Sequence, residues 1–454
     1  YSVRNEETQE LNKEALMSLY RTMTLCLIAI CAAAIAQKPA VPRHAGSEWP
    51  QFRGPGGSGV SMEEGLPTTW SATENIAWKA PLPGHGASSP IVSGNRVFVT
   101  CFSGFGLDEK SPGEQSDLKL HVVCIDRRSG KIAWEKSPRS KALPKYGAFG
   151  KFTALHGFAS STPATDGKAV YTFFGHTGVV AFDLQGEQLW TADVGAKTHG
   201  FGTGASPVLY RDLLIVNASV ESRSLIALDR QTGAEVWRAE GIKDAWNTPV
   251  FVKADSGRDE VVVDTKNGVR AFDPQSGRAL WHCAGSNPPR YICPSPVANN
   301  GVLYALHGYF GPLTAIRAGG QGDVSGSHRV WQTPGRKLGS NVSSPVWHAG
   351  RVYWAKTERG GVFCLDADTG ELLYRDKLRP DPGRIYASPL VVDGKLYYVS
   401  RKNGTYVLAA KPTFELLAHN VISTDDSAFN ASPAVTEGHL FLRSDKFLYD
   451  IRTE

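Results

Sequence analysis

The stretch ALDRQTGAEVW at residues 227–237 returns in altered form as AFDPQSGRALW at residues 271–281. Both copies place a small residue two positions before an Asp, a hydroxyl residue and Gly shortly after it, and Trp at the end. An Asp carboxylate in this place can accept hydrogen bonds from backbone N–H groups of a tight turn, and Gly supplies the positive φ that closes a hairpin. Each copy therefore predicts two β-strands joined by a tight turn, with Trp on the second strand.

A second signal, a small hydroxyl residue followed by Pro, recurs along the chain. These pairs, which we call the anchors, are Ser89-Pro90, Thr162-Pro163, Ser206-Pro207, Thr248-Pro249, Ser295-Pro296, Ser344-Pro345, Ser388-Pro389 and Ser432-Pro433. After a first interval of 73 residues, they follow one another at intervals of 42 to 49 residues. A repeat of about 40–50 residues is typical of a four-stranded propeller blade. The sequence thus predicts an all-β fold, an eight-bladed β-propeller of four-stranded antiparallel blades.

The residues that define the turn and the outer strand are expected to hold the blades together. The Trp is large enough to pack between neighbouring blades. In some copies the small residue before Asp is Cys124 or Cys364, which we expect to fill the core. Two copies depart from the pattern: the fifth has a longer turn over 318–327, and the seventh has Lys411-Pro412 in place of Asp and Gly. The predicted structural residues of the repeat are Asp126, Trp134, Asp183, Trp190, Asp229, Trp237, Asp273, Trp281, Asp366 and Trp78.

The two ends of the repeat region predict how the ring closes. The last repeat stops after a third strand at 447–452, and an unpaired fourth strand at 75–79 precedes the first anchor. We expect this N-terminal strand to complete the last blade, because closure removes the open edges of a sheet. The predicted divisions are a signal peptide with extra upstream residues (1–36), an N-terminal extension (37–74) and the propeller (75–454).

The repeat resembles the PQQ-like (pyrroloquinoline quinone) repeat, A-x-D-x-x-[ST]-G-x-x-x-W, of the quinoprotein alcohol dehydrogenase-like superfamily. The resemblance covers residues 48–454. The stretch Trp49–Pro55 is similar to one in secreted bacterial propellers of the BamB-like type, which resemble the propeller subunit of the outer-membrane assembly machinery, and we expect it to cover the seam of the ring. Because both enzymes and scaffolds use this fold, the resemblance implies a shape and leaves the activity open.

The first 36 residues predict export. The apolar run at 25–36 is shorter than the about 20 residues that span a bilayer, and it ends in the A-x-A pattern Ala34-Ile35-Ala36. We expect cleavage near Ala36 and a periplasmic or secreted protein without a transmembrane span, for which peripheral membrane association stays open. A buried apolar helix and a lipoprotein anchored through Cys31 are the alternatives.

Charge and cysteine content limit the partners. The formal net charge of +5 over 454 residues argues against a nucleic-acid partner. Separately, we expect the protein to be a monomer. Five cysteines follow the predicted cleavage site, so at most two disulfides can form. Cys283 and Cys293 are close in sequence and can pair in an oxidising compartment.

The loops that enter the first strand of each blade, with those between the second and third strands, are expected to ring one mouth of the central channel. Loops on a rigid scaffold commonly carry binding sites. The arm at 102–118 is the longest such loop and a candidate lid or docking arm. The candidate residues for binding a ligand or partner are His85, His156, His199, Trp246, Arg290, Tyr291, Lys337, Arg384, Tyr386 and Arg401.

Three functions are open for this mouth. The first is a non-catalytic scaffold that binds an envelope protein or peptide; the second is a PQQ-dependent oxidoreductase; the third is a module that binds a carbohydrate or another small molecule. A cationic mouth suits the three carboxylates of PQQ. The resemblance would require a calcium-ligand set and adjacent cysteines, but the sequence has no Cys-Cys pair and no acidic cluster stands out at the mouth. PQQ with Ca²⁺ stays an alternative that these residues do not support, and we predict no cofactor, no metal site and no catalytic residue. The first function is favoured.

Overall fold

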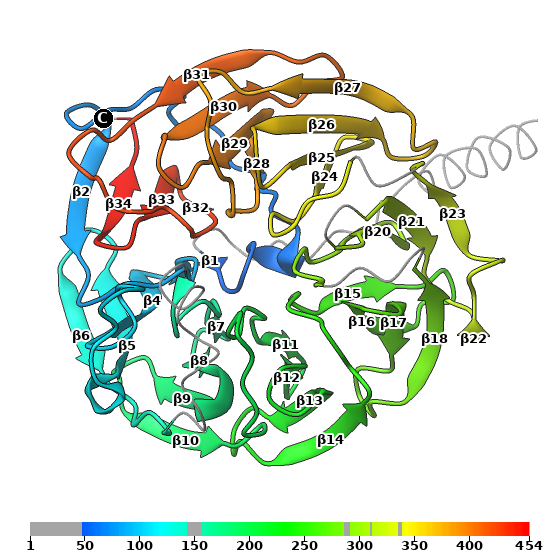
Figure 1. The fold of residues 1–454 in the computed structure, drawn as a ribbon, viewed down its shortest axis with the longest axis horizontal. Helices are drawn as coiled ribbons and strands as arrows, with labels where there is room; N and C mark the ends of the chain where they lie inside the picture. Colours follow the sequence, from blue (N-terminus) through cyan, green and yellow to red (C-terminus); the bar gives the residue numbers. More distant parts are fainter. Residues whose placement is uncertain (1–47, 143–155, 286–290, 309–310, 335–337, 454) are drawn as a thin grey trace, which may run out of the picture. The chain divides into compact units, whose positions relative to one another are not determined.

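Each predicted repeat folds into one antiparallel sheet, and eight such blades surround a common axis (Figure 1). The computed structural model describes residues 48–142, 156–285, 291–308, 311–334 and 338–453. The strands are numbered along the chain, and the first strand of each blade is the innermost. This arrangement confirms the predicted eight-bladed β-propeller. The predicted signal peptide lies outside the described residues.

The first four blades comprise β3 to β6 (Ile91–Ser93, Arg96–Ser103, Lys119–Asp126, Ile132–Lys136), β7 to β10 (Ala164–Thr165, Ala169–Phe173, Val179–Asp183, Gln188–Ala192), β11 to β14 (Val208–Tyr210, Leu213–Ala218, Ser224–Asp229, Glu235–Glu240) and β15 to β18 (Val250–Lys253, Asp259–Thr265, Gly268–Phe272, Ala279–Ala284). The next three comprise β19, β20, β21 and β23 (Val297–Asn299, Val302–Leu306, Leu313–Arg317, Arg329–Gln332), β24 to β27 (Val346–His348, Arg351–Ala355, Gly361–Asp366, Leu372–Lys377) and β28 to β31 (Leu390–Val392, Lys395–Val399, Thr405–Ala409, Leu416–Asn420).

The last blade is built from both ends of the repeat region. It comprises β32 (Ala434–Thr436), β33 (His439–Arg443), β34 (Phe447–Ile451) and the N-terminal strand β2 (Ile76–Pro81). Strand β2 pairs antiparallel with β34, so that Lys79 faces Tyr449. The predicted closure of the ring by an N-terminal strand is confirmed.

Asp and Trp of the repeat join neighbouring blades. In the third blade the Asp229 carboxylate accepts hydrogen bonds from the Thr232 N–H and hydroxyl groups, both at 2.8 Å. The outer-strand Trp then docks on this turn in the next blade and donates its indole N–H to a turn carbonyl. The donors are Trp78, Trp134, Trp190, Trp237 and Trp331, at 2.7–3.1 Å from the carbonyl oxygens of Arg127, Leu184, Arg230, Pro274 and Ala367.

The fourth blade departs from this scheme because the turn that would receive Trp281 is longer. Residues 322–323 of that turn form β22 (Gly322–Asp323), which adds to the outer edge of β18 in parallel. Trp281 instead donates its indole N–H to the buried Glu260 carboxylate of its own blade at 2.7 Å.

The cysteines divide into core residues and one channel residue. Cys124 and Cys364 are fully buried, which confirms their predicted role as core fillers. The possible pairing of Cys283 with Cys293 does not occur, because both are free thiols. Cys283 is buried on β18, where an Arg329 N–H group lies 3.8 Å from its sulfur, whereas Cys293 lies on the wall of the central channel.

The N-terminal segment closes one end of the channel. Strand β1 (Glu48–Trp49) pairs with β3 of the first blade, and Trp49 is buried in a core shared with the last two blades, at the seam of the ring. The short 3-10 helix η1 (Pro55–Gly57) then lies at the centre of the ring in Figure 1. The buried guanidinium of Arg53 donates hydrogen bonds to the Ser58 and Pro345 carbonyls, which ties this crossing to the sixth blade.

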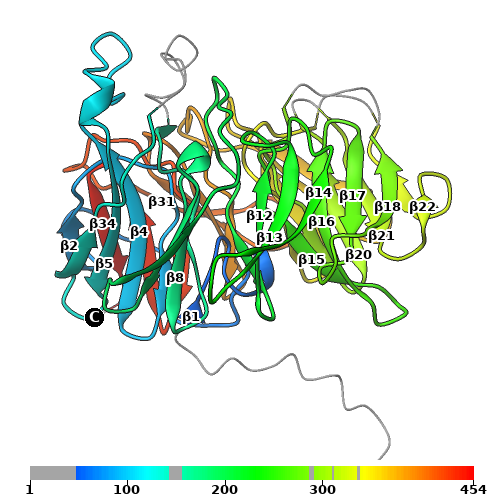
Figure 2. The ribbon, with the colours of Figure 1, turned by 90° about the horizontal axis from the view of Figure 1, so that it is seen from below.

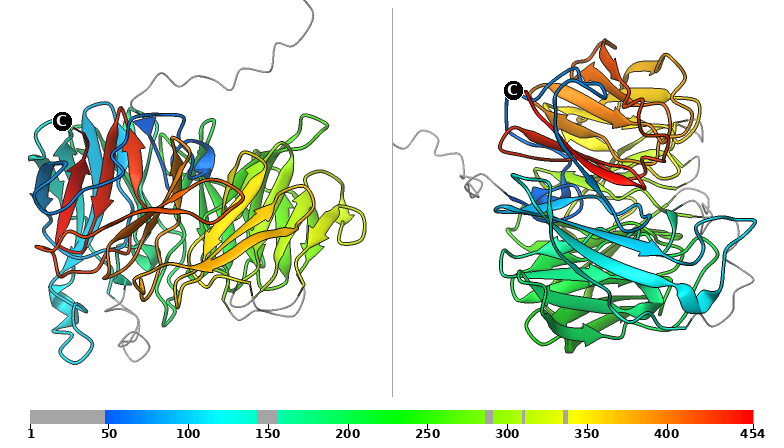
Figure 3. Two further views of the ribbon diagram at one scale, coloured as in Figure 1. Left: turned by 90° about the horizontal axis from the view of Figure 1, so that it is seen from above. Right: turned by 90° about the vertical axis from the view of Figure 1, so that its left-hand side faces the viewer.

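The arm at 102–118 projects from the opposite face. Figure 2 shows the arm in cyan at one end of the molecule and the N-terminal segment in blue at the other, and Figure 3 shows the same separation from two further sides. The base of the arm is packed, since Phe105 is buried and its ring stacks on that of Phe158 at 5.9 Å. The arm and the N-terminal segment therefore lie at opposite ends of the channel.

Candidate functional site

The eight anchors form a closed ring of hydrogen bonds around the channel, which we call the hydroxyl ring. The backbone N–H of each anchor Ser or Thr donates to the side-chain hydroxyl oxygen of the next blade's anchor. Ser89 donates to Thr162, and, after a full turn, Ser432 donates back to Ser89. All eight bonds measure 2.8–3.0 Å. The small hydroxyl residue of each anchor thus links one blade to the next.

The hydroxyl ring lines a cavity of about 570 Å³ that opens at the arm face. Phe52 of the N-terminal segment contributes to the wall of this cavity, near the end that the segment closes. Cavities of roughly 300–1,000 Å³ are the size that holds small ligands or inserted side chains. The channel is therefore large enough to admit a small ligand or an inserted side chain.

Four aromatic rings from three consecutive entering loops gather on one side of that entrance. They belong to His199 and Phe201, Trp246, and Tyr291, which precede the third, fourth and fifth blades. Every pair among them is in contact, with ring centroids 4.6–6.3 Å apart. The Trp246 indole N–H donates to the Gly202 carbonyl at 2.8 Å, which fixes the ring, and Tyr291 remains 36% exposed. This aromatic cluster is an apolar contact surface held in place before any ligand arrives.

Cations and a tyrosine form the facing side of the entrance. The guanidinium of Arg401 lies over the Tyr386 ring at 5.0 Å, a cation–π arrangement, and its Nε donates to the Asn430 side-chain oxygen at 2.6 Å. Arg384 is exposed, and its guanidinium lies 3.4 Å from the Tyr386 hydroxyl. This second side is polar and carries positive charge.

The three predicted histidines do not share one site. His156 lines the channel and hydrogen bonds through Nδ1 to the Ser160 hydroxyl at 2.6 Å; burial lowers the pKa of His156 to about 4, so its ring is neutral at neutral pH. His199 belongs to the aromatic cluster, and burial lowers its pKa as well. His85 pairs through its backbone with Phe102 at the base of the arm.

The other predicted mouth residues are placed as follows. Trp246, Tyr291, Arg384 and Tyr386 line the same cavity as His156, and Arg401 lies behind Tyr386. Arg290 and Lys337 lie outside the described residues. Sequence reasoning missed several wall residues: Asn341, Thr357, Cys293, Asn430 and the anchor hydroxyl groups themselves. The anchors carried the one available signal, since a hydroxyl residue precedes Pro in every blade.

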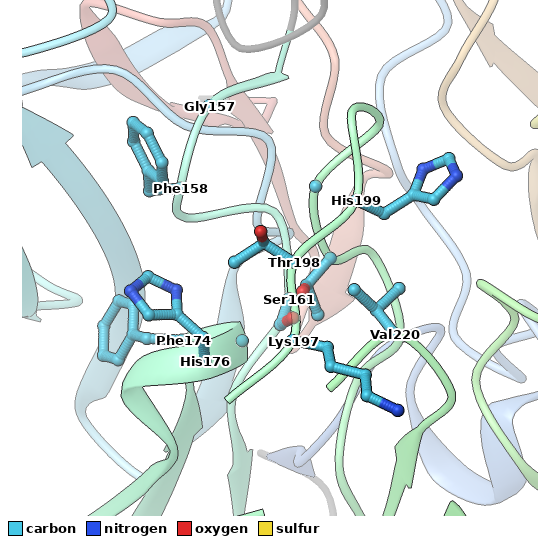
Figure 4. Close-up of a pocket in the computed structure, with 12 residues that line it drawn as sticks. Gly157, Phe158, Ser161, Phe174, His176, Lys197, Thr198, His199 and Val220 are labelled. Atoms are coloured by element: carbon cyan, nitrogen blue, oxygen red, sulfur yellow. The ribbon is translucent and has the colours of Figure 1, made fainter. Parts of the chain in front are cut away.

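A smaller pocket of about 30 Å³ lies beside the mouth, between loops of the second and third blades (Figure 4). Phe158, Phe174 and His176 lie on one side of it, and Lys197 points away from His176. Its volume suits a few water molecules at most. The carboxylate of Glu221 lies next to two of its lining residues, accepting a hydrogen bond from the Thr203 hydroxyl and lying near Gly175.

Comparisons with known proteins agree with this fold. The family model described as "Outer membrane protein assembly factor BamB" matches residues 118–331 and 323–412. Among solved structures, BamB from Moraxella catarrhalis is similar, with 15% identity, a TM-score of 0.53 and coverage of 83% of this chain and 99% of that chain. No curated protein matches the chain.

Dehydrogenases share the fold too. A europium-containing methanol dehydrogenase has a TM-score of 0.62 at 11% identity, covering 87% of this chain and 89% of that one. The quinohemoprotein alcohol dehydrogenase from Comamonas testosteroni has a TM-score of 0.62 at 12% identity, covering 90% and 81%. The protein is therefore a PQQ-like β-propeller. Since the matched segments make up more than half of its length, the chain belongs to the family described as outer membrane protein assembly factor BamB.

The channel wall does not match what a metal-bound quinone cofactor would need. Glu358 is the one carboxylate among the described residues that line the cavity, and it is exposed at the entrance. Within the described ranges, no group of three or more His, Cys, Asp or Glu side chains is placed to hold a metal ion. A calcium site requires six to eight oxygen ligands, usually with several carboxylates. The residues present thus do not fit that group.

Proposed function

We propose that the protein is a non-catalytic, extracytoplasmic scaffold that binds a segment of a protein or peptide at the open mouth of its channel. The observation that carries this proposal is the pairing of a fixed aromatic cluster with a cationic, tyrosine-bearing side across the entrance of the channel. Peptides offer both apolar side chains for the first surface and carbonyl or carboxylate oxygens for the second.

The orientation of the aromatic rings favours a peptide over a carbohydrate. A sugar face packs best on a flat aromatic platform, whereas the rings of Trp246 and Tyr291 meet at 69° and those of Phe201 and Trp246 at 89°. Rings that are set edge to face can enclose an inserted side chain, but they offer no flat platform for a sugar ring. The aromatic cluster is thus shaped for a compact apolar side chain.

The location and the partner follow from the family and are proposals for this chain. A protein of the envelope is the proposed partner, bound by a monomer. Across the residues that the structure describes, no helix is both long and apolar enough to cross a membrane.

The test measures binding to an array of random 12-residue peptides. The array is probed separately with the purified wild-type protein and with the variant Tyr291→Ala. The matched control is Tyr210→Ala, because Tyr210 lies at the far end of β11 and stacks on Phe251 away from the mouth. We expect a defined subset of peptides to bind the wild-type protein and the control, and binding to Tyr291→Ala to fall at least tenfold. Equal binding by both variants, or no bound peptide for the wild-type protein, would contradict the proposal.

A further inference from the structure

The hydroxyl ring has hydrogen-bonding capacity that the fold does not use. Each of its eight oxygens accepts one backbone N–H, while a Ser or Thr hydroxyl also carries one hydrogen to donate. Among the described residues, no protein acceptor receives any of these eight O–H groups. All eight side chains are 1–6% exposed and all eight line the channel. The channel therefore contains a ring of buried donors without protein acceptors.

The other polar side chains of the wall add hydrogen-bond donors and, among the described residues, only one carboxylate. The Asn341 and Asn430 amides and the Cys293 thiol lie in the same wall. The exposed Glu358 carboxylate stands at the entrance, where Arg384 also lies. His156 is neutral because burial lowers its pKa to about 4, and it therefore adds no positive charge. A ligand that fits this wall must bring acceptors.

We propose that the channel binds a carboxylate through the hydroxyl ring. A carboxylate has two oxygens that accept about four hydrogen bonds and donates none, so it matches a wall of O–H groups. Hydrogen bonds to an ionised acceptor are about twice as strong as neutral ones, which offsets the cost of removing the charge from water. An ammonium group could use only the second lone pair that each hydroxyl oxygen keeps, and the guanidinium groups of Arg384 and Arg401 at the entrance would repel it.

The carboxylate has two possible sources that share this chemistry. It is either an acidic side chain of the segment bound at the mouth, in which case the inference rests on the proposed function, or a free small carboxylic acid. The aromatic cluster would hold the apolar part of such a ligand while the charged end reaches the ring.

The experiment measures binding by isothermal titration calorimetry. The first probes are succinate and its neutral analogue succinamide, titrated into the wild-type protein. The second are a Glu-containing peptide that binds in the array, and the same peptide with Gln in place of Glu. This ligand comparison uses the unmodified protein and does not depend on any variant folding.

The matched variants change hydroxyl groups and leave the shape of the ring. Thr162→Val with Thr248→Val removes two hydroxyl groups, whereas Thr162→Ser with Thr248→Ser keeps them. The valine pair also leaves the Ser89 and Ser206 N–H groups without their acceptors, so its cooperative unfolding is measured first. We expect the valine pair to bind the carboxylate at least tenfold more weakly and the serine pair to bind within twofold of wild type.

Each outcome decides between the two proposals. Preference for Glu over Gln, lost in the valine pair, supports both. Binding of succinate over succinamide without any bound peptide supports the carboxylate site and contradicts the peptide scaffold. Peptide binding without preference for an acidic residue, together with no binding of succinate, contradicts the carboxylate site and leaves the scaffold standing. Binding of neither probe contradicts both.

Discussion

Each outer-strand Trp except Trp281 packs closely against one Gly of the next blade's turn, as the contact between Trp237 and Gly277 shows. The Trp237 ring packs on Gly277, whose φ is +71° and where an added Cβ would lie 2.5 Å from the ring. We expect Gly277→Ala to destabilise the protein by more than about 1 kcal/mol beyond the strain of its backbone. Gly257→Ala is the control, because Gly257 has a φ of +83° and open space around its Cβ. Urea unfolding of both variants measures the difference; equal losses would mean that the Trp contact tolerates a methyl group.

A second residue-scale feature is the buried Glu221 beside the small pocket. Burial raises the pKa of Glu221 from its ordinary value near 4.5 to about 7, although the Thr203 hydroxyl hydrogen bond acts in the opposite direction. A carboxyl group with a raised pKa in the folded state stabilises the protein below the unfolded pKa, and this contribution is lost as the pH rises towards 7.

Glu221→Gln should remove this pH dependence. Between about pH 4.5 and pH 8 the wild-type protein should lose about 3 kcal/mol that the variant keeps, since a neutral side chain does not titrate. The measurement is the urea midpoint of both proteins at several pH values. All other groups titrate in both proteins. If the two plots of urea midpoint against pH run parallel, ionisation of Glu221 does not destabilise the folded protein.

At the scale of elements, β22 shows how the fifth repeat's longer turn is used. It covers the outer edge of β18, where Val324 is buried against the core that contains Trp281, and the Ala284 N–H donates to the Ser325 hydroxyl at 2.8 Å. Strand edges with unpaired backbone groups favour such cover.

We expect Val324→Asp to release this cover, because it buries a charge in an apolar core. Hydrogen exchange at Ala284 should become at least tenfold faster while the inner strands of the blade stay protected. Val330→Asp is the control, since Val330 is an exposed residue of the outer strand β23. Unchanged exchange at Ala284 would mean that other residues of the turn hold β22 on the edge of β18, and that burial of Val324 is not required.

For the molecule as a whole, the sequence predicts the fold better than the site. Number, spacing and closure of the blades follow from the anchors and the Asp–Trp turns, because each blade repeats the same local chemistry. The hydroxyl ring does not follow, since a Ser before Pro indicates a turn and its partner is about 45 residues away in another blade. The sequence leaves the pairing of Cys283 with Cys293 open, because closeness in sequence says little about which side of a sheet each residue occupies. The long turn that deprives Trp281 of its usual partner can be recognised in the sequence as a departure from the repeat. The strand β22 that this turn adds to the blade cannot be recognised there.

The N-terminal segment decides whether the ring is closed. It adds strand β2 to the last blade and buries Trp70, whose ring stacks on Tyr397 at 6.2 Å and whose backbone N–H donates to the Asn420 side chain at 3.1 Å. Without it, β34 has an open edge and the apolar core at the seam is exposed to water. An incomplete ring of this kind loses both hydrogen bonds and buried apolar area.

A chain that begins at Leu82 should therefore fail to unfold cooperatively and should aggregate at micromolar concentration. Adding a synthetic peptide of residues 48–81 should restore a cooperative transition, because the segment is held by pairing and packing and requires no covalent link. A peptide with Trp70→Ala and Ala80→Asp should not restore it, since both side chains are buried in the native segment. Thermal unfolding followed by circular dichroism and light scattering distinguishes these states. If the shortened chain unfolds at the same midpoint as the full one, the ring closes through its other seven blades and the segment only covers the channel.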